Sequence, residues 1–308
     1  MSYYLGIDGG GTKTTCAVGD ERRLVARATA GASNIVRVGE AQARESLQQC
    51  VRQACAAAGI SLEQVAHTCV GGSGAARPEL AAIVREIVAE IVATPIDVVG
   101  DMQIALEAAF DTGPGVIVIA GTGSIAYGRD REGKTLRAGG WGFAIGDEGS
   151  AHWIGRSAVS AVLRASERES LEGGSLLLAK DLFNAWGVSS LSDLARAANS
   201  IPPPDFAALF PAAAASKDEV ARQVLRSAGR ELADLAAVVT RRLFAKDNAA
   251  PVPVAMSGGV FCHAAIVREV FYNELRRLDA RSQVNPQVVD PVEGALQMAR
   301  RESHAVES

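Results

Sequence analysis

Apolar runs and amphipathic stretches alternate along this chain in an order that occurs twice. Three strand-like runs occupy about residues 3–29, and a helical pattern follows at residues 40–58, where apolar residues recur at helical spacing. The first half is completed by a strand ending at Gly71-Gly72, a helix at 78–92, a strand at 96–100 and a helix at 102–110. This β-β-β-α-β-α-β-α order predicts an α/β domain.

The same order begins again after the tract Asp111-Thr112-Gly113-Pro114-Gly115, whose Pro/Gly cluster halts the helical pattern. Its predicted elements are three strands at 116–139, a strand at 252–256, a helix, a strand at 287–289 and a helix at 292–299. A long helical insertion is predicted at about 148–245, with breaks at Gly173-Gly174 and at residues 201–204. Capping boxes at residues 61–64 and 216–219 predict the starts of a short helical turn and of the insertion's last helix.

These patterns divide the chain into three parts. We expect a first domain at residues 1–114, a second at 115–290, and a C-terminal helix and tail at 291–308 that frays from Arg300 onward. A hinge between the domains is expected near residues 113–115.

Composition narrows the class of protein. With 308 residues, 48% hydrophobic and 21% charged, the chain is long enough for two domains with their own cores and is not of disordered or fibrous type. With a net charge of −4, the chain lacks the excess of positive charge that is typical of nucleic-acid-binding domains. No apolar run reaches membrane-spanning length, and no signal-peptide pattern precedes Tyr3. We therefore expect a cytoplasmic protein with neither nucleic acid nor membrane as partner.

The cysteines do not predict a metal site. The five cysteines form no CxxC pair, and the chain has only four histidines. Cys50 and Cys55 fall on a predicted helix five residues apart, which places them on different faces. We expect all five to be buried or half-buried free thiols.

Two glycine–hydroxyl turns, Gly9-Gly10-Gly11-Thr12 and Gly121-Thr122-Gly123-Ser124, each join two strand-like runs. The first is not a Walker loop, because Thr12 separates Gly11 from Lys13. Nor is it a dinucleotide fingerprint, because a strand-like run follows it and not a helix. Backbone N–H groups and a hydroxyl on such a turn favour phosphate binding, although a plain glycine hairpin is the alternative for the first turn taken alone.

Several polar residues beside these turns allow two interpretations. Asp8 either holds Mg²⁺ or forms a turn. Lys13 either neutralises phosphate charge or is a solvated strand residue. Asp101 ends a strand and begins a helix, so it is an N-cap or a general base at a strand's carboxyl end. Asn34 is a turn residue or a reader of a ligand hydroxyl.

Two further glycine-rich segments add candidate residues. Residues 139–150 hold five glycines, which predicts a loop that brings backbone amides and Asp147 to the hydroxyls of a sugar, with Trp141 packing nearby. Within it, Glu148 is expected to cap the helix that begins near Ser150. Gly258 and Gly259 lie between a strand and a helix, where the backbone can approach a flat base.

Together these segments resemble the N-acetylglucosamine kinase branch of the BadF/BadG/BcrA/BcrD ATPase family. The resemblance rests on four stretches: residues 6–14, 121–124, 139–150 and 257–259. It implies an α/β fold of duplicated ribonuclease H-like, or actin-like ATPase, domains, each a mixed sheet with helices, with a cleft between them. It also implies ATP and Mg²⁺ as cofactors, and a homodimer that phosphorylates the 6-hydroxyl of an amino sugar such as N-acetylglucosamine, glucosamine or N-acetylmuramic acid.

The resemblance assigns a role to each candidate residue. It places Asp101 as the base, Asp8 at Mg²⁺, and these residues at ATP: Gly10, Gly11, Thr12, Lys13, Thr122, Gly123, Gly258 and Gly259. The sugar would be bound by Asn34, Asp101, Gly140, Trp141, Gly142 and Asp147.

Two other functions stay open. The family's other branch activates 2-hydroxyacyl-CoA dehydratases through an iron–sulfur cluster held by cysteines. Here Cys262 follows the glycine pair without a second cysteine in a matching position. A non-catalytic sugar-sensing module is the third alternative.

Overall fold

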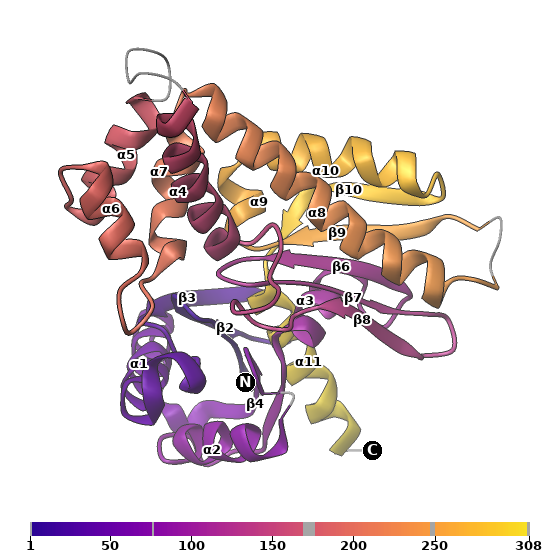
Figure 1. The fold of residues 1–308 in the computed structure, drawn as a ribbon. Coiled ribbons are helices and arrows are strands. Elements are labelled where there is room, and N and C mark those ends of the chain that lie inside the picture. The colour runs from indigo at the N-terminus through magenta and orange to yellow at the C-terminus, as the bar shows by residue number, and fades with distance from the viewer. Residues whose placement is uncertain (1, 76, 169–175, 247–249, 307–308) are drawn as a thin grey trace. The chain divides into compact units, whose positions relative to one another are not determined.

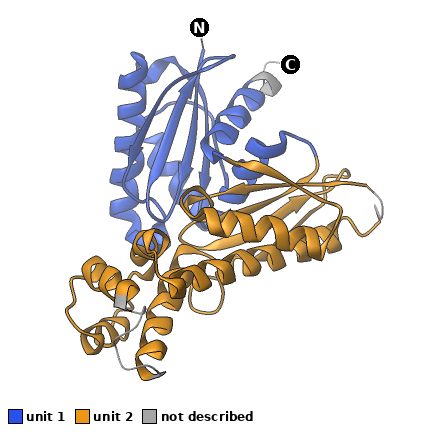
Figure 2. Cartoon of the chain, turned by 90° about the horizontal axis from the view of Figure 1, so that it is seen from above, with its two compact units in different colours: residues 1–113, 289–308 blue, residues 114–288 orange. Residues whose placement is uncertain are grey.

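The computed structural model describes residues 2–75, 77–168, 176–246 and 250–306. The chain forms two compact units (Figure 2), one of residues 1–113 with 289–308 and one of residues 114–288. The division falls within the Pro/Gly tract that separates the two repeats. The last helix of the chain joins the first unit.

The first unit is a five-stranded mixed sheet with helices on both faces (Figure 1). Its strands are β1 (Tyr3–Gly9), β2 (Thr14–Gly19), β3 (Leu24–Ala30), β4 (Val65–Gly72) and β5 (Ile96–Gly100). Its helices are α1 (Ile35–Ala58), the 3₁₀ turn η1 (Leu62–Gln64), α2 (Pro78–Ala89), α3 (Asp101–Phe110) and α11 (Pro291–Val306). The strand order is β3-β2-β1-β4-β5, with β2 antiparallel and β4 parallel to β1.

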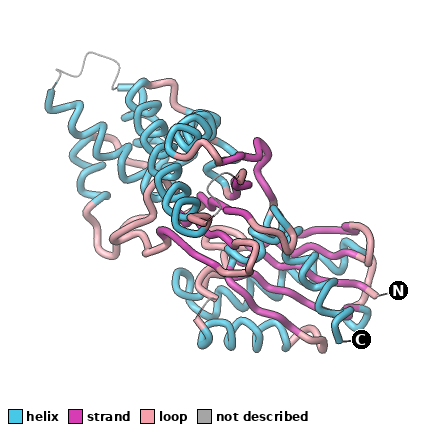
Figure 3. Tube along the Cα trace, turned by 90° about the vertical axis from the view of Figure 1, so that its right-hand side faces the viewer, coloured by secondary structure: helices cyan, strands magenta, loops and turns pink. Residues whose placement is uncertain are grey.

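Alternating side chains of β1 serve two separate cores. Leu5 and Ile7 pack with α1 and α2 on one face of the sheet, while Tyr4 packs with α3 and α11 on the other. Figure 3 shows these strands between helices, near the labelled chain ends. Both faces are covered, as expected for parallel strands that are apolar throughout.

Helix α11 lies against the first sheet and α3 at very short range. A Cβ atom added at Gly294 would lie 2.0 Å from the carbonyl oxygen of Ile104, and one at Gly6 would lie 2.3 Å from the Leu296 nitrogen. The helix does not fray from Arg300, as the sequence predicted, but continues to Val306. The Arg300 side chain donates to the Asp20 carbonyl (2.7 Å), which ties this turn of the helix to the sheet.

The second unit repeats the order of the first. Its strands are β6 (Gly115–Ala120), β7 (Ser124–Arg129), β8 (Thr135–Gly139), β9 (Val252–Ser257) and β10 (Ser282–Val289), in the order β10-β9-β6-β7-β8. Its helices are α4 (Ala151–Arg168), α5 (Leu176–Trp186), α6 (Leu191–Ala198), η2 (Phe206–Leu209), α7 (Phe210–Ala215), α8 (Glu219–Leu243), α9 (Gly259–His263) and α10 (Ala265–Leu278). The predicted duplication is therefore confirmed, with α4 to α8 as the insertion.

Local side-chain caps moved several predicted boundaries. Helix α1 begins five residues before the predicted start because Asn34 caps it, and a non-helical Gly39 (φ 78°) interrupts it before the regular apolar repeat begins. The cap of α8 is Asp218 and not Ser216, since the Asp218 carboxylate accepts from the Val220 amide at 2.9 Å. Helix α2 ends three residues early, and β10 begins five residues before the prediction. The predicted break at Gly173-Gly174 lies outside the described residues.

All five cysteines are free thiols, but they are not all buried. Cys16, Cys50, Cys55 and Cys69 are buried in the first unit, whereas Cys262 is exposed, contrary to the expectation for that residue. Burial raises the pKa of Cys50 and Cys55 to about 11 and that of Cys69 to about 12. Thiols held protonated in this way are poor nucleophiles. Within the described ranges, no helix is long and apolar enough to cross a membrane.

Candidate active site

The carboxyl ends of the parallel strands β1, β4 and β5 meet at one edge of the first sheet. In the register, Gly9 lies opposite Gly72, and Gly72 lies opposite Gly100. Residues that follow these three strands therefore come together, although about sixty and thirty positions separate them in the chain. Ligands of open α/β sheets bind at this edge.

In the first glycine turn, between β1 and β2, the Gly10 carbonyl faces the backbone that leads into α1. The Gly10 amide donates to the Lys13 carbonyl (3.0 Å), and the Gly10 carbonyl accepts from the Ser33 and Asn34 amides at 3.1 and 3.3 Å. In a planar trans peptide, the C=O and the following N–H point in opposite directions. The Gly11 N–H therefore faces away from Ser33 and Asn34.

Asp8, at the end of β1, is half-buried among other carboxylates. Burial together with the charges of Asp101 and Asp290 raises its pKa from 3.8 to about 7, against the opposing charge of Lys13. The sequence reasoning missed Asp290, which precedes Pro291 at the start of α11. Its carboxylate accepts from the Val292 amide (3.3 Å) and pairs with Arg27 at 2.8 Å. An acidic residue directly before a proline-initiated helix was the available signal.

Asp101 is held by two hydrogen bonds. Its Oδ2 accepts from the Ser73 hydroxyl (2.5 Å) and its Oδ1 from the Met102 amide (2.9 Å). It is not the N-cap that its position suggested, because α3 is capped at Gly100, whose amide donates to Gln103 Oε1 at 2.9 Å. Ser73 was also missed, although it directly follows the strand that ends in two glycines.

Asn34 is the N-cap of α1, and this decides which of its atoms can meet a ligand. Its Oδ1 accepts from the Val36 and Arg37 amides at 3.1 and 3.3 Å. Because the carbonyl oxygen of the side chain faces the amides of α1, the NH₂ group of the same side chain points away from the helix. Asn34 can therefore donate to a ligand oxygen while it caps the helix.

The second glycine turn, between β6 and β7, is built in the same way as the first. The Gly121 amide donates to the Gly123 carbonyl at 2.9 Å, and the Gly121 and Thr122 carbonyls accept from the Ala151 and His152 amides of α4 at 2.9 and 3.3 Å. By the same peptide geometry, the N–H groups of Thr122 and Gly123 point away from α4. In both turns, neighbouring backbone binds the carbonyls and leaves amides on the opposite side.

Asp147 lies against this second turn. Its backbone takes a left-handed conformation (φ 64°), which is uncommon for a residue other than glycine and fixes where its side chain lies. A Cβ atom at Gly123 would lie 3.0 Å from Asp147 Oδ2, so Gly123 makes room for the carboxylate. Burial raises the pKa of Asp147 more than the amide hydrogen bonds from Ser124 and Gly142 lower it.

The remainder of the 139–150 segment is an exposed loop before a capped helix. Gly140 and Gly142 have positive φ (69° and 92°), and Trp141 between them is 66% exposed, with Arg137 5.1 Å above its ring. The cap of α4 is Ser150, whose hydroxyl accepts from the Trp153 amide at 3.1 Å. The expectation that Glu148 caps this helix was wrong.

The two glycines after β9 have different environments. A Cβ atom at Gly258 (φ 99°) would lie 2.4 Å from the Ala120 carbonyl, so the end of β9 packs tightly on β6 there. A Cβ atom at Gly259 would meet nothing within 4 Å. Gly259 therefore presents open backbone at the start of α9.

The predicted site residues form one group in each unit. The first unit holds Asp8, Gly10, Gly11, Thr12, Lys13, Asn34 and Asp101, and the second holds Thr122, Gly123, Gly140, Trp141, Gly142, Asp147, Gly258 and Gly259. In neither group, as far as the described residues extend, do three or more His, Cys, Asp or Glu side chains form a cage for a metal ion.

Comparison with known proteins identifies the family. The model of the BadF/BadG/BcrA/BcrD ATPase family matches residues 5–299. This chain belongs to that family. It is 32% identical to the N-acetylmuramic acid/N-acetylglucosamine kinase of Clostridium acetobutylicum over 98% of this chain and 99% of that protein. It is 29% identical to the N-acetyl-D-glucosamine kinase of Dictyostelium discoideum over 96% of this chain and 97% of that one.

A solved structure agrees with this assignment. The crystal structure of a Chromobacterium violaceum protein assigned as an N-acetylglucosamine kinase superposes with a TM-score of 0.74 at 26% identity. The superposition covers 97% of this chain and 99% of that one. The two mixed sheets of the family member described here thus have the duplicated actin-like ATPase fold that the resemblance implied.

Proposed function

We propose that this family member transfers the γ-phosphoryl group of ATP to the 6-hydroxyl of an amino sugar. The observation that carries the proposal is Asp101, a carboxylate held by Ser73 and the Met102 amide at the edge of the sheet where the first glycine turn also lies. A carboxylate fixed in this way can accept a proton from a substrate hydroxyl. The names of the two kinases that align along almost the whole chain support the same reaction.

The two glycine turns are the proposed phosphate sites. Amides of Gly11, Thr122 and Gly123 point away from the groups that bind the turn carbonyls, as a phosphate site requires. The proposed partners of ATP are Gly10, Gly11, Thr12, Lys13, Thr122 and Gly123 at the phosphates, with Gly258 and Gly259 at the adenosine. The open space at Gly259 agrees with this last assignment.

Asp8 fits a Mg²⁺ ion that is held mainly by water and phosphate. Its pKa is raised first by burial and then by the charges of Asp101 and Asp290, and a divalent cation would offset this concentration of negative charge. Mg²⁺ is commonly bound through one or two carboxylates plus substrate phosphates, and it needs no protein cage. When bound, the ion would neutralise charge on the transferred phosphoryl group.

Chemistry of this kind is mostly positioning and charge stabilisation. Asp101 would orient the 6-hydroxyl and take its proton, while the Asn34 amide donates to another sugar hydroxyl. Asp147 and the backbone at Gly140, Trp141 and Gly142 are the proposed sugar contacts from the second unit. The structure keeps Asp147 buried at the second turn, where its carboxylate is available as an acceptor.

A coupled ADP-release assay over a panel of sugars tests the proposal. The panel holds N-acetylglucosamine, glucosamine, N-acetylmuramic acid, glucose and a sample without sugar. We expect ADP release that depends on sugar, and a loss of about 10²–10⁴-fold in kcat for Asp101→Asn. Asparagine can still accept from the Met102 amide, so this variant should fold and bind both substrates. Near-normal turnover by Asp101→Asn would refute the role of Asp101.

The alternatives predict other outcomes in the same assay. ATP hydrolysis that is independent of sugar, together with a coloured bound cluster, would indicate an activator of a partner enzyme. Sugar binding without ADP release would indicate a sensing module. We also propose that the kinase is a cytoplasmic homodimer, which light scattering and cell fractionation can test.

A further inference from the structure

Three parallel strands of the first sheet end level with one another, and Ser73 follows the middle one. The strands β1, β4 and β5 end in register at Gly9, Gly72 and Gly100. Because β4 lies between β1 and β5, the residue that follows β4 can contact the chain at the ends of both neighbouring strands. That residue is Ser73, and Asp101, the proposed base, follows β5.

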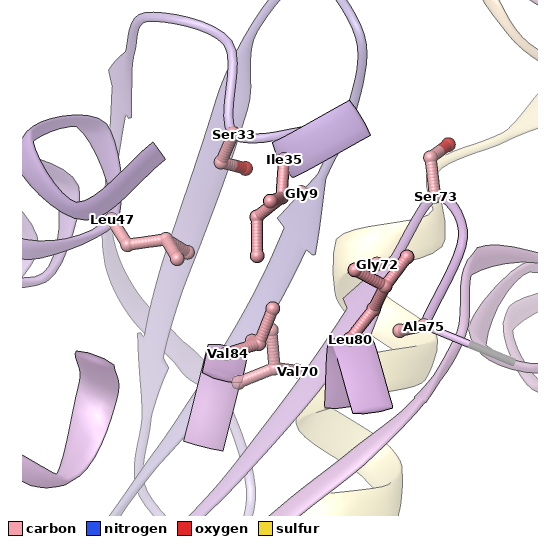
Figure 4. A pocket seen from close by; sticks show the side chains of 10 residues that line it. All are labelled: Gly9, Ser33, Ile35, Leu47, Val70, Gly72, Ser73, Ala75, Leu80 and Val84. Carbon is pink, nitrogen blue, oxygen red and sulfur yellow. The ribbon is translucent and has the colours of Figure 1, made fainter. Parts of the chain in front are cut away.

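Ser73 makes a hydrogen bond in each of these directions. Its backbone amide donates to the Gly9 carbonyl at 3.0 Å, at the entry to the first glycine turn. Its hydroxyl donates to Asp101 Oδ2 at 2.5 Å, a length typical of a hydroxyl bound to a carboxylate. Figure 4 shows the Ser73 hydroxyl oxygen pointing away from the apolar side chains of Val70 and Val84. Ser73 therefore ties the proposed base to a turn that is proposed to bind phosphate.

The backbone, and not the Ser73 hydroxyl, shapes the turn in which this residue lies. The Ala75 amide donates to the Gly72 carbonyl at 3.0 Å, and the bond from Ser73 to Gly9 also uses an amide. Both bonds remain when the Ser73 side chain is shortened to alanine. The hydroxyl can therefore be removed without loss of these two bonds, and its partner is the carboxylate of Asp101.

The Ser73 bond matters because it completes the fixation of the carboxylate. Oδ1 of Asp101 accepts from the Met102 amide at 2.9 Å, and Oδ2 accepts from Ser73. A carboxylate bonded at one oxygen can still turn about its Cβ–Cγ bond, whereas bonds at both oxygens fix its plane. Each oxygen keeps a further lone pair that can accept from a substrate hydroxyl. Orientation fixed before the substrate arrives lowers the barrier, because small misplacements of reacting groups are costly.

We infer that Ser73 is a positioning residue of this site, whose hydroxyl fixes the Asp101 carboxylate relative to the first glycine turn. The inference rests on the proposed kinase function, because that function assigns Asp101 as the base. Ser73 acts through Asp101 and accepts no proton itself. Loss of its hydroxyl therefore slows phosphoryl transfer and leaves the binding of ATP and sugar nearly unchanged.

Removal of the hydroxyl is the first test. We expect Ser73→Ala to lower kcat about 10- to 100-fold, as for a lost hydrogen bond to a charged group, with KM for ATP and for N-acetylglucosamine within about threefold of wild type. Ser73→Thr keeps the hydroxyl and should retain kcat within about threefold. If the alanine variant does not fold, Ser73→Cys replaces the hydroxyl by a weak donor of similar shape and should lower kcat in the same way.

A second serine–aspartate pair provides the matched control. The Ser190 hydroxyl donates to Asp193 Oδ2 at 2.7 Å at the start of α6, outside the proposed site. Ser190→Ala removes the same kind of bond and should leave kcat unchanged. An equal loss of kcat in Ser190→Ala and Ser73→Ala would overturn the inference.

A double-mutant cycle is the second test. In the Asp101→Asn background, measured by single-turnover kinetics, Ser73→Ala should change the rate by less than about twofold, because the base through which Ser73 acts is gone. Equal losses from Ser73→Ala in both backgrounds would show that the hydroxyl acts independently of Asp101 and would overturn the inference. A defect of Ser73→Ala in KM alone would do the same.

These outcomes are distinguishable from failure of the proposed function. Normal kcat in Ser73→Ala, together with loss of activity in Asp101→Asn, overturns the positioning role alone and leaves the kinase proposal intact. An absence of sugar-dependent ADP release from the wild-type protein overturns both.

Discussion

Asp8→Asn is expected to make the metal-free protein more stable above neutral pH. Burial and the neighbouring carboxylates raise the pKa of Asp8 from 3.8 to about 7, so the fold prefers the protonated acid. Between these two values the folded state binds more protons than the unfolded chain, and stability therefore falls as pH rises through this window. The full cost of the charged carboxylate is present above pH 7. Asparagine has the shape of the acid without this charge.

The size of the effect follows from the shift. The difference between 3.8 and about 7 is about three pKa units. Each unit corresponds to about 1.4 kcal/mol, which gives about 4 kcal/mol for the full shift. Solvent screening of the half-buried Asp8 lowers this, so the gain in unfolding free energy at pH 8 is on the order of 2–4 kcal/mol. At pH 4, where wild-type Asp8 is neutral in the fold, the two proteins should have nearly equal stability. Glu45→Gln, an exposed carboxylate on α1, is the control and should shift stability at neither pH.

Urea unfolding in EDTA at pH 4 and pH 8 measures this difference. All three tryptophans lie in the second unit, so tryptophan fluorescence would report on the wrong unit. Hydrogen exchange of peptides from β1 and β4, followed by mass spectrometry, reads the first unit directly. A variant that is less stable than wild type at pH 8, or a difference that is the same at both pH values, would refute the reasoning.

Two other substitutions test the proposed ligand contacts. Asn34→Asp keeps the oxygen that caps α1 but removes the NH₂ donor, so KM for the sugar should rise about tenfold while the melting temperature stays near wild type; Asn34→Ala should lose about 1 kcal/mol of stability as well. An unchanged KM for Asn34→Asp would remove Asn34 from the site. Gly123→Ala should displace Asp147, whose Oδ2 would lie 3.0 Å from the new methyl carbon, and lower kcat/KM at least tenfold. Gly121→Ala, where the same methyl meets nothing within 4 Å, is the matched control, and equal effects of the two changes would contradict this account.

The repeat could be predicted from the sequence, because each strand and each helix has its own local pattern of apolar and polar positions and needs no knowledge of distant contacts. Both strand–turn–strand motifs and the insertion appear where the pattern placed them. Helix starts were less predictable, since a single cap such as Asn34 or Ser150 decides them and several polar residues near each start could serve. Pattern alone also could not assign α11 to the first unit, because this depends on close packing at Gly294 and Gly6.

The two missed residues, Ser73 and Asp290, share a physical reason. Each follows a strand whose partner in the sheet is distant in sequence, so its neighbours are set by strand register and not by chain order. Ser73 meets Asp101 because β4 and β5 are parallel and end together at Gly72 and Gly100. A rule that every residue after a parallel strand be considered jointly would have found Ser73.

The repeat also explains how one fold can divide the proposed work between its halves. Asp101 follows the last strand of the first sheet, and Asp290 follows the last strand of the second, so the two aspartates occupy equivalent positions. Asp101 is bound by Ser73 and a helix amide, whereas Asp290 caps α11 and pairs with Arg27. Of these two aspartates, Asp290 is neutralised by an arginine, whereas Asp101 is held by a hydroxyl and an amide, as suits the proposed base.

The same comparison applies after the fourth strand of each sheet. Ser73 follows β4, and its counterpart after β9 is Gly258. A Cβ atom added at Gly258 would lie 2.4 Å from the Ala120 carbonyl oxygen, so no side chain fits there. A serine at this point orients a carboxylate, while a glycine at the equivalent point lets backbone pack closely and leaves Gly259 open. This difference between equivalent positions agrees with the proposed proton transfer in the first half and the proposed adenosine contact in the second. Gly258→Ser should accordingly weaken ATP binding without creating a second base, since Asp290, the aspartate equivalent to Asp101, caps α11 and pairs with Arg27.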